Sequence, residues 1–259
     1  MAVTAITTAL ALSAGRGTGA VWVLLAVASG QFSVGWSNDY LDRERDARAQ
    51  RSDKPIVARQ VNAHLVGVCA VVALIICIPL SMFSGWRAGT IHLIAVALAW
   101  LYNIWLKSTI FSAVPYALAF GLLPVFVALG LEGHPLPRRW AIIAASLLGI
   151  GAHFINTLPD LEVDRANGVY GMPHRFSSTA TLVLGALLIA TSTVVIAMAT
   201  IESTNRGRIA LVLLAIGGAV AVCVAGIAGR HRAAWTLTIF SAGVSVSAFI
   251  ANGGAFVNV

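Results

Sequence analysis

The chain has 259 residues, of which 58% are hydrophobic and only 10% are charged. Soluble domains are about 25% charged, so this composition excludes a soluble globular domain and indicates a polytopic membrane protein. The net charge of +7 does not indicate nucleic-acid binding, because the Arg and Lys residues lie in short loops between apolar segments rather than on one solvated face.

Nine apolar segments qualify, or nearly qualify, as membrane spans of about 20 residues. They are residues 2–15, 18–36, 61–83, 89–106, 110–131, 139–158, 178–200, 208–228 and 233–254. The first segment is short, so either other packing completes it or the native chain begins earlier. We therefore predict an all-α fold: a polytopic membrane bundle of about nine transmembrane helices around a central cavity, forming a single domain over residues 1–259.

The distribution of basic residues predicts the orientation of this bundle. Loops after even-numbered spans hold eleven of the seventeen Lys and Arg residues, and the positive-inside rule places those loops in the cytoplasm. In a bacterium the protein then lies in the cell membrane, surrounded by membrane lipids. Glu132 and Glu202 fall on the opposite side and are interpreted as ordinary solvated loop residues.

Two short clusters hold eight of the ten acidic residues. One cluster follows span two and the other follows span six, so both are predicted on the cytoplasmic side. Carboxylates at a membrane boundary are costly and indicate function. The even offset of four spans also predicts two parallel pseudo-repeats, about residues 1–135 and 136–259, that meet around one central site.

The spacing within the first cluster predicts which carboxylates share a face. If span two continues as a helix, Asp39, Asp42 and Asp46 stand at i, i+3 and i+7 on one side, and Glu44 points away. The second cluster repeats this spacing, because Asp160 and Asp164 are i, i+4 neighbours in a continuing helix. Glu162 then faces elsewhere.

Such carboxylates repel one another unless a cation lies between them. Hard oxygen ligands favour Mg²⁺ or Ca²⁺ over zinc, and Mg²⁺ is commonly shared between one or two carboxylates and substrate phosphates. The clusters therefore predict Mg²⁺ as a cofactor that holds a diphosphate. Donors for the diphosphate lie nearby in the sequence: Arg51, Lys54, Lys107 and Arg175.

The sequence resembles the UbiA superfamily of intramembrane prenyltransferases. Asn38-Asp39-x-x-Asp42-x-x-x-Asp46 matches the first aspartate motif of that family, and Asp160-x-x-x-Asp164-x-x-x-Gly168 resembles the second. Arg51-x-x-Lys54-Pro55-Ile56 and Tyr102-Asn103-x-x-x-Lys107 resemble its two basic segments. The resemblance covers the whole chain.

The resemblance implies that the protein binds a prenyl diphosphate and Mg²⁺ under a cytoplasmic cap. The metal and the diphosphate are then held by the five aspartates, and the other motif residues assist. The implied metal ligands are Asp39, Asp42, Asp46, Asp160 and Asp164. The implied assisting residues are Asn38, Arg51, Lys54, Tyr102 and Lys107.

Two departures from the family pattern affect these expectations. The residues that family members have ahead of span one are absent from this sequence, and in relatives they help to shape the acceptor pocket. After Gly168 the chain runs from Val169 to Arg175 without the usual basic-then-Thr pattern. These departures leave the identity of the acceptor open. They also weaken the prediction that the loop after Gly168 contacts the diphosphate.

Further residues are candidates for the lining of the cavity. Aromatic rings stabilise an allylic cation through cation–π contact, and seven lie near the motifs: Phe32, Trp36, Tyr40, Trp105, Phe111, Tyr116 and Phe154. Packing against lipid or core is the alternative for each of them. His153, seven residues before Asp160, is either a base, a ligand or a hydrogen-bonded core residue.

The predicted function is Mg²⁺-dependent transfer of a prenyl group from a prenyl diphosphate to a small hydrophobic acceptor, aromatic or lipid-like, within the membrane. A terpene cyclase of the same superfamily is the first alternative, since it shares the metal site and lacks an acceptor. An ion transporter is the second, but its carboxylates are expected near mid-span, whereas these lie at span ends.

Overall fold

The structure, a computed structural model, describes residues 1–199 and 205–257 of the chain. Within these residues every long element is an α-helix, and the one extended pairing is an isolated bridge between Pro137 and Val257. Glu202 lies outside the described residues. The helices are α1 (Ala2–Ser13), α2 (Ala20–Arg48), α3 (Ala63–Met82), α4 (Trp86–Ile104), α5 (Ala113–Leu129), α6 (Arg139–Thr157), α7 (Leu161–Ala166), α8 (Ser178–Ala199), α9 (Asn205–Ile227) and α10 (His231–Ala251).

The predicted membrane bundle is confirmed. Eight helical segments among the described residues are long and apolar enough to cross a membrane. The remaining apolar segment, the first in the sequence, forms α1, which has 12 residues. At about 1.5 Å per residue this helix covers roughly 18 Å, less than the ~30 Å hydrocarbon core, so α1 does not cross the membrane alone.

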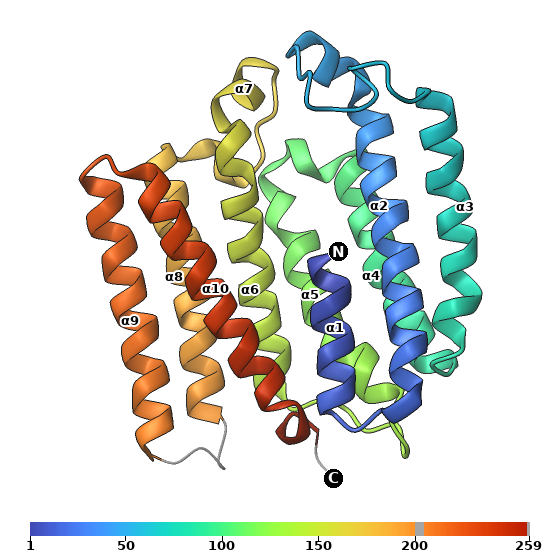
Figure 1. The fold of residues 1–259 in the computed structure, drawn as a ribbon, viewed down its shortest axis with the longest axis vertical. Helices are drawn as coiled ribbons and strands as arrows, with labels where there is room; N and C mark the ends of the chain where they lie inside the picture. The colour runs from blue at the N-terminus through green and yellow to red at the C-terminus, as the bar shows by residue number, and fades with distance from the viewer. Residues whose placement is uncertain (200–204, 258–259) are drawn as a thin grey trace.

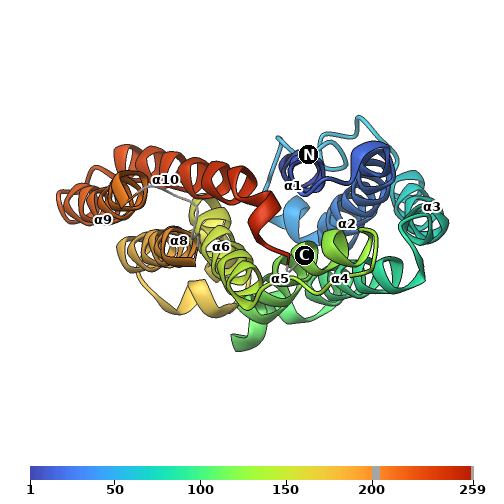
Figure 2. The ribbon, with the colours of Figure 1, turned by 90° about the horizontal axis from the view of Figure 1, so that it is seen from below.

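The helices run side by side in two groups (Figure 1). Seen from below, α1 to α5 lie on one side and α6 to α10 on the other (Figure 2), and α5 packs directly against α6 between them. The short helix α7 and the connection from α2 to α3 both lie at the upper end of Figure 1. Two acidic clusters far apart in the sequence are thereby brought to one end of the bundle.

Glycine allows the close contact between the two groups. A Cβ atom on Gly149 of α6 would lie 2.5 Å from the Tyr116 carbonyl oxygen and 2.7 Å from the Phe120 Cβ atom of α5. Small residues at such contacts let helix backbones approach one another in a membrane. The contact fixes α5 against α6 and so holds the Tyr116 and Phe120 rings at the junction. The division into two pseudo-repeats stays a prediction.

Candidate active site

The first acidic cluster forms the last turns of α2. This helix is 29 residues long and continues past the apolar segment to Arg48. Asp42 and Asp46 are each only 5% exposed. Glu44 lies between them in sequence, but its side chain is 74% exposed. The face predicted from the helical spacing is therefore present in the structure.

Basic side chains from two other segments neutralise this cluster. Asp42 forms ion pairs with Lys107, in the 3-10 turn (Leu106–Ser108) that follows α4, and with Arg45, one turn further along α2 and 2.6 Å away. Lys54 extends from the loop after α2 and places its Nζ 2.7 Å from the Asp39 Oδ1. Burial lowers the pKa of the Lys107 ammonium below its usual value, and the Asp42 carboxylate opposes that shift. The Asp42 carboxylate thus favours the charged form of Lys107.

The second acidic cluster differs from the continuous helix that the spacing predicted. Pro159 has no backbone N–H and cannot continue the i, i−4 hydrogen bonds, so α6 ends at Thr157. A 3-10 turn over Leu158–Asp160 follows, and Asp160 then occupies the N-cap position of the separate helix α7, without a capping hydrogen bond from its side chain. Glu162 is exposed, as predicted.

Each aspartate of the second cluster has its own cationic or polar partner. Arg51, from the loop after α2, places Nη1 2.9 Å from the Asp160 Oδ2, which joins the two halves of the chain. His174 Nε2 lies 3.2 Å from the Asp164 Oδ2. Arg175, the predicted donor in this loop, is exposed and is not among the residues lining the cavity. The sequence did not distinguish these two adjacent residues, because only the loop conformation turns His174 inward.

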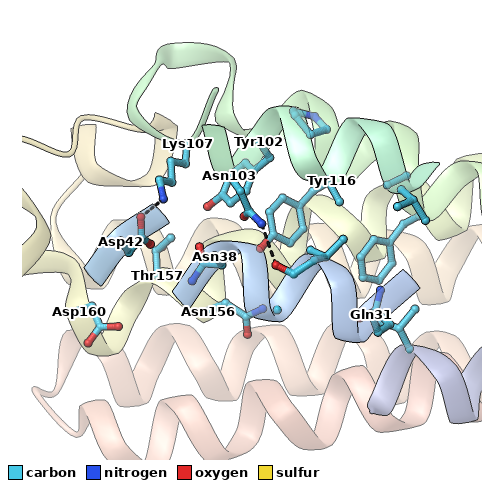
Figure 3. Close-up of a pocket in the computed structure, with 18 of the residues that line it drawn as sticks. Gln31, Asn38, Asp42, Tyr102, Asn103, Lys107, Tyr116, Asn156, Thr157 and Asp160 are labelled. Carbon is cyan, nitrogen blue, oxygen red and sulfur yellow. Dashed lines mark hydrogen bonds and ion pairs between the residues drawn. The ribbon is translucent and has the colours of Figure 1, made fainter. Parts of the chain in front are cut away.

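One cavity of about 490 Å³ joins both clusters. Its mouth is lined by charged side chains, and its interior by α2, α4, α5 and α6 (Figure 3). The charged residues of the mouth are Asp42, Arg45, Asp46, Arg51, Lys54, Lys107, Asp160 and Asp164. Asn38, Tyr102 and Asn103 line the level below them. Asp39 is not among the lining residues, and its carboxylate faces Lys54.

The interior is mostly apolar and aromatic. It includes Val34, Ala99, Pro115, Phe120 and Leu123. The Tyr116 ring lies between Tyr102, 5.1 Å away edge-on, and His153, which it stacks against at 4.6 Å. Of the seven aromatic candidates from the sequence, Tyr116 is the one that lines the cavity, and Phe32, Trp105 and Phe111 are exposed on the outside. Helical spacing near a motif does not reveal which ring faces inward.

His153 is a buried core residue in the structure. Its side chain is 1% exposed, and its Nε2 lies 2.9 Å from the Ser112 Oγ. The Ser112 Oγ also accepts a 2.8 Å hydrogen bond from the Met172 backbone N–H. His153 therefore helps to hold the loop after α7 against α5 and α6, and it does not line the cavity.

The residues at the mouth fit the oxygen chemistry of Mg²⁺. Asp42, Asp46, Asp160 and Asp164 all line it, together with the Asn38 amide. Among the described residues no group of three or more His, Cys, Asp or Glu side chains is close enough to hold a metal by itself. A site that supplies only part of the coordination sphere suits an ion that is shared with phosphate oxygens and water.

The family match agrees with this geometry. The model of the UbiA prenyltransferase family matches residues 1–255. The chain belongs to this family. The predictions of the family and of a prenyltransferase enzyme are thus confirmed. No curated protein matches the chain by sequence.

Solved structures of distant UbiA homologues share the fold. A UbiA homologue from Aeropyrum pernix K1 superposes with a TM-score of 0.73 at 16% identity, covering 96% of this chain and 97% of the homologue. A homologue from Archaeoglobus fulgidus bound to DMAPP and Mg²⁺ gives a TM-score of 0.69 at 18% identity, covering 98% and 95%. A digeranylgeranylglyceryl phosphate synthase gives 0.64 at 14% identity, covering 99% and 94%. The ion in the second structure agrees with the prediction of Mg²⁺ as the cofactor.

Proposed function

We propose that this UbiA-family protein transfers a prenyl group from a prenyl diphosphate to a small hydrophobic acceptor, aromatic or lipid-like, inside the membrane. The observation that supports this most directly is the single cavity with a charged mouth and an apolar interior. A prenyl diphosphate has the same division, with a charged head and a hydrocarbon tail. DMAPP and GPP, bound with Mg²⁺ in the Archaeoglobus fulgidus homologue, are ligands of this kind.

The acidic residues at the mouth are the proposed metal ligands. Asp42, Asp46, Asp160 and Asp164 line the cavity, and Asp39 lies on the same helix face beside Lys54. When bound, Mg²⁺ supplies positive charge to the diphosphate oxygens and so makes the diphosphate a better leaving group. Two of the carboxylates come from each half of the chain, so both halves are needed for one site.

The basic residues at the mouth are the proposed diphosphate ligands. Lys107, Arg45, Arg51 and Lys54 each pair with an aspartate in the structure. They are therefore already placed at the mouth, where negative charge grows as the C–O bond of the diphosphate ester breaks. The diphosphate leaves with the bonding electron pair, and the acceptor forms a new bond to the allylic carbon and loses a proton.

The interior of the cavity protects the allylic cation. Apolar residues of α4 and α5 exclude water, which otherwise captures the cation and yields an alcohol. The faces of Tyr102, Tyr116 and Phe120 provide cation–π stabilisation. The Tyr116 ring stacks on His153 and meets Tyr102 edge-on, which fixes its orientation.

The first expected result concerns the reaction and its metal dependence. The protein is reconstituted in nanodiscs with GPP, Mg²⁺ and a lipid extract from the organism that encodes it. The products are identified by mass spectrometry. We expect a prenylated acceptor with Mg²⁺ and none with EDTA, because the carboxylates of the mouth supply the oxygen ligands that Mg²⁺ prefers. A hydrocarbon formed from GPP without any acceptor indicates a cyclase instead. Full prenyl transfer in metal-free buffer contradicts the proposed metal site.

The second expected result concerns orientation. We propose that the mouth faces the cytoplasm, as the distribution of basic residues predicts. Ala47, at the end of α2, and Ala166, at the end of α7, are both exposed and lie in different halves of the chain. In a background without the native cysteines, a cysteine at each position is expected to react with a membrane-impermeant maleimide only from the cytoplasmic side. Labelling of the two positions from opposite sides contradicts the shared mouth.

A further inference from the structure

The deep end of the cavity contains two polar side chains that the proposed chemistry does not use. Gln31 of α2 and His92 of α4 both line it. His92 precedes Tyr102 by ten residues, and Gln31 precedes Asp42 by eleven. At about 1.5 Å of rise per residue, both therefore lie roughly 15 Å from the charged mouth along their helices. They are surrounded by apolar residues such as Val27, Val96 and Leu123.

The contacts of His92 favour one tautomer of its ring. The Ser81 hydroxyl donates to the Cys77 carbonyl oxygen at 2.6 Å, and the same Ser81 Oγ lies 2.8 Å from the His92 Nδ1. A hydroxyl has only one proton to donate. With that proton on the Cys77 carbonyl, the Ser81 Oγ is left as an acceptor, and the tautomer that matches it carries the proton on the His92 Nδ1. The Nε2 atom is then a bare hydrogen-bond acceptor.

The His92 ring is also held in place by its surroundings. It is 3% exposed and stacks on Phe126 with the ring centroids 4.7 Å apart. A Cβ atom on Gly30 would lie 3.5 Å from the His92 Cε1, so α2 closes over one edge of the ring. The position of Nε2 is therefore set before any ligand arrives, which lowers the entropy that binding costs.

Neither polar group is satisfied by the protein. In the part of the chain that the structure describes, the one hydrogen-bond contact of the His92 ring with a hydroxyl is at Nδ1, and neither the His92 Nε2 nor the Gln31 carboxamide makes a hydrogen bond. Figure 3 shows the Gln31 side chain on the cavity side of α2. Covering such groups with hydrocarbon costs free energy, because nothing replaces the hydrogen bonds to water. A prenyl tail is therefore a poor occupant of this end of the cavity.

We infer that Gln31 and His92 form a recognition site for a hydroxyl group of the acceptor, at the end remote from the carbon or heteroatom that is prenylated. A hydroxyl donates to the His92 Nε2 and accepts from the Gln31 amide, so one group satisfies both residues. This inference rests on the proposed function, because it specifies the class of acceptor. The acceptor is an extended aromatic or lipid-like molecule with a hydroxyl group at its far end.

The test compares two probes that differ by one hydrogen-bond donor, 2-naphthol and 2-methoxynaphthalene. Binding to the protein in nanodiscs is measured by titration calorimetry, with empty nanodiscs subtracted. We expect the wild-type protein to bind 2-naphthol about five- to tenfold more tightly, the effect of about one buried hydrogen bond. His92→Phe keeps the ring stacking and removes Nε2, so the ratio is expected to fall to about one. Gln31→Leu is a second variant, expected to weaken the binding of both probes together, because the oxygen of either probe accepts from the Gln31 amide.

Two control variants separate this site from the mouth. Leu123→Met changes an apolar lining residue, so it is expected to alter both affinities together and leave their ratio unchanged. Asp160→Asn is also expected to preserve the ratio, because it changes only the mouth. A wild-type protein that binds both probes equally, or a His92→Phe protein that still prefers 2-naphthol, overturns the inference.

A separate measurement tests the proposed function on the same preparations. Release of diphosphate from GPP is followed with and without Mg²⁺. If release is absent while the preference for 2-naphthol is present and lost in His92→Phe, the proposed reaction is contradicted and the hydroxyl site is supported. If release is present and the preference absent, the reaction is supported and the hydroxyl site is contradicted.

Discussion

Asp42→Asn is expected to lower prenyl-transfer activity by at least about a hundredfold, whereas Glu44→Gln is expected to change it by less than about twofold. Both substitutions replace a carboxylate with an amide on the same helix, two residues apart. Asp42 lines the mouth of the cavity, but Glu44 is 74% exposed. Losing one electrostatic contact to a transition state costs about 2.7–4 kcal/mol, and a solvated carboxylate contributes far less.

The partners of Asp42 determine how this experiment must be controlled. Its carboxylate pairs with Lys107, whose side chain is only 11% exposed, and with Arg45. Removing one partner of a buried ion pair destabilises a protein by about 3–5 kcal/mol. The unfolding temperature of Asp42→Asn is therefore measured beside its activity. The double variant Asp42→Asn/Lys107→Met removes the unpaired cation and is expected to recover stability without recovering activity.

A Glu44→Gln protein that loses as much activity as Asp42→Asn contradicts the assignment of the α2 face. Recovery of activity in the double variant also contradicts it, because it means that Asp42 acts only by compensating the charge of Lys107. Activity is read as kcat and KM for the prenyl diphosphate, so that loss of binding and loss of turnover are separated.

Asp42→Asn and Asp160→Asn are expected to be strongly non-additive. The two residues are on α2 and on the 3-10 turn before α7, in different halves of the chain, yet both line one mouth. Residues that act on one group as a unit do not contribute independent factors to the rate. We expect each single variant to lose most of the activity and the double variant to be less than about tenfold worse than the poorer single one.

Arg51→Gln extends this test to the contact that joins the two halves. Arg51 follows α2 in sequence and pairs with Asp160 at 2.9 Å. Its loss is expected to raise the KM for the prenyl diphosphate, because the diphosphate loses a donor. A matched change at the exposed Arg48, Arg48→Gln, is expected to leave KM unchanged. Fully additive losses for Asp42→Asn and Asp160→Asn indicate two separate sites and favour the transporter alternative.

The sequence by itself determined the class of the protein and the chemistry of its site. Long apolar segments can satisfy backbone hydrogen bonds in lipid only as helices or closed barrels, and their lengths indicate helices. Helical periodicity placed Asp39, Asp42 and Asp46 on one face of α2, because that helix continues without Pro or a break to Arg48. The preference of Mg²⁺ for oxygen ligands then predicted this ion as the cofactor. The Mg²⁺ bound in structures of UbiA homologues agrees with that prediction.

Only the tertiary structure decided which side chains meet. Pro159 breaks the helix after span six, so the i, i+4 spacing of the second cluster does not describe its geometry. The conformation of the following loop pairs Asp164 with His174 and leaves Arg175 exposed. The pairs Lys107–Asp42 and Arg51–Asp160 join residues 65 and 109 positions apart. Periodicity describes neighbours within one helix, whereas contacts between helices depend on how whole helices pack. For the same reason, the inward direction of Gln31, His92 and Tyr116 was visible only once α2, α4, α5 and α6 enclosed a common cavity.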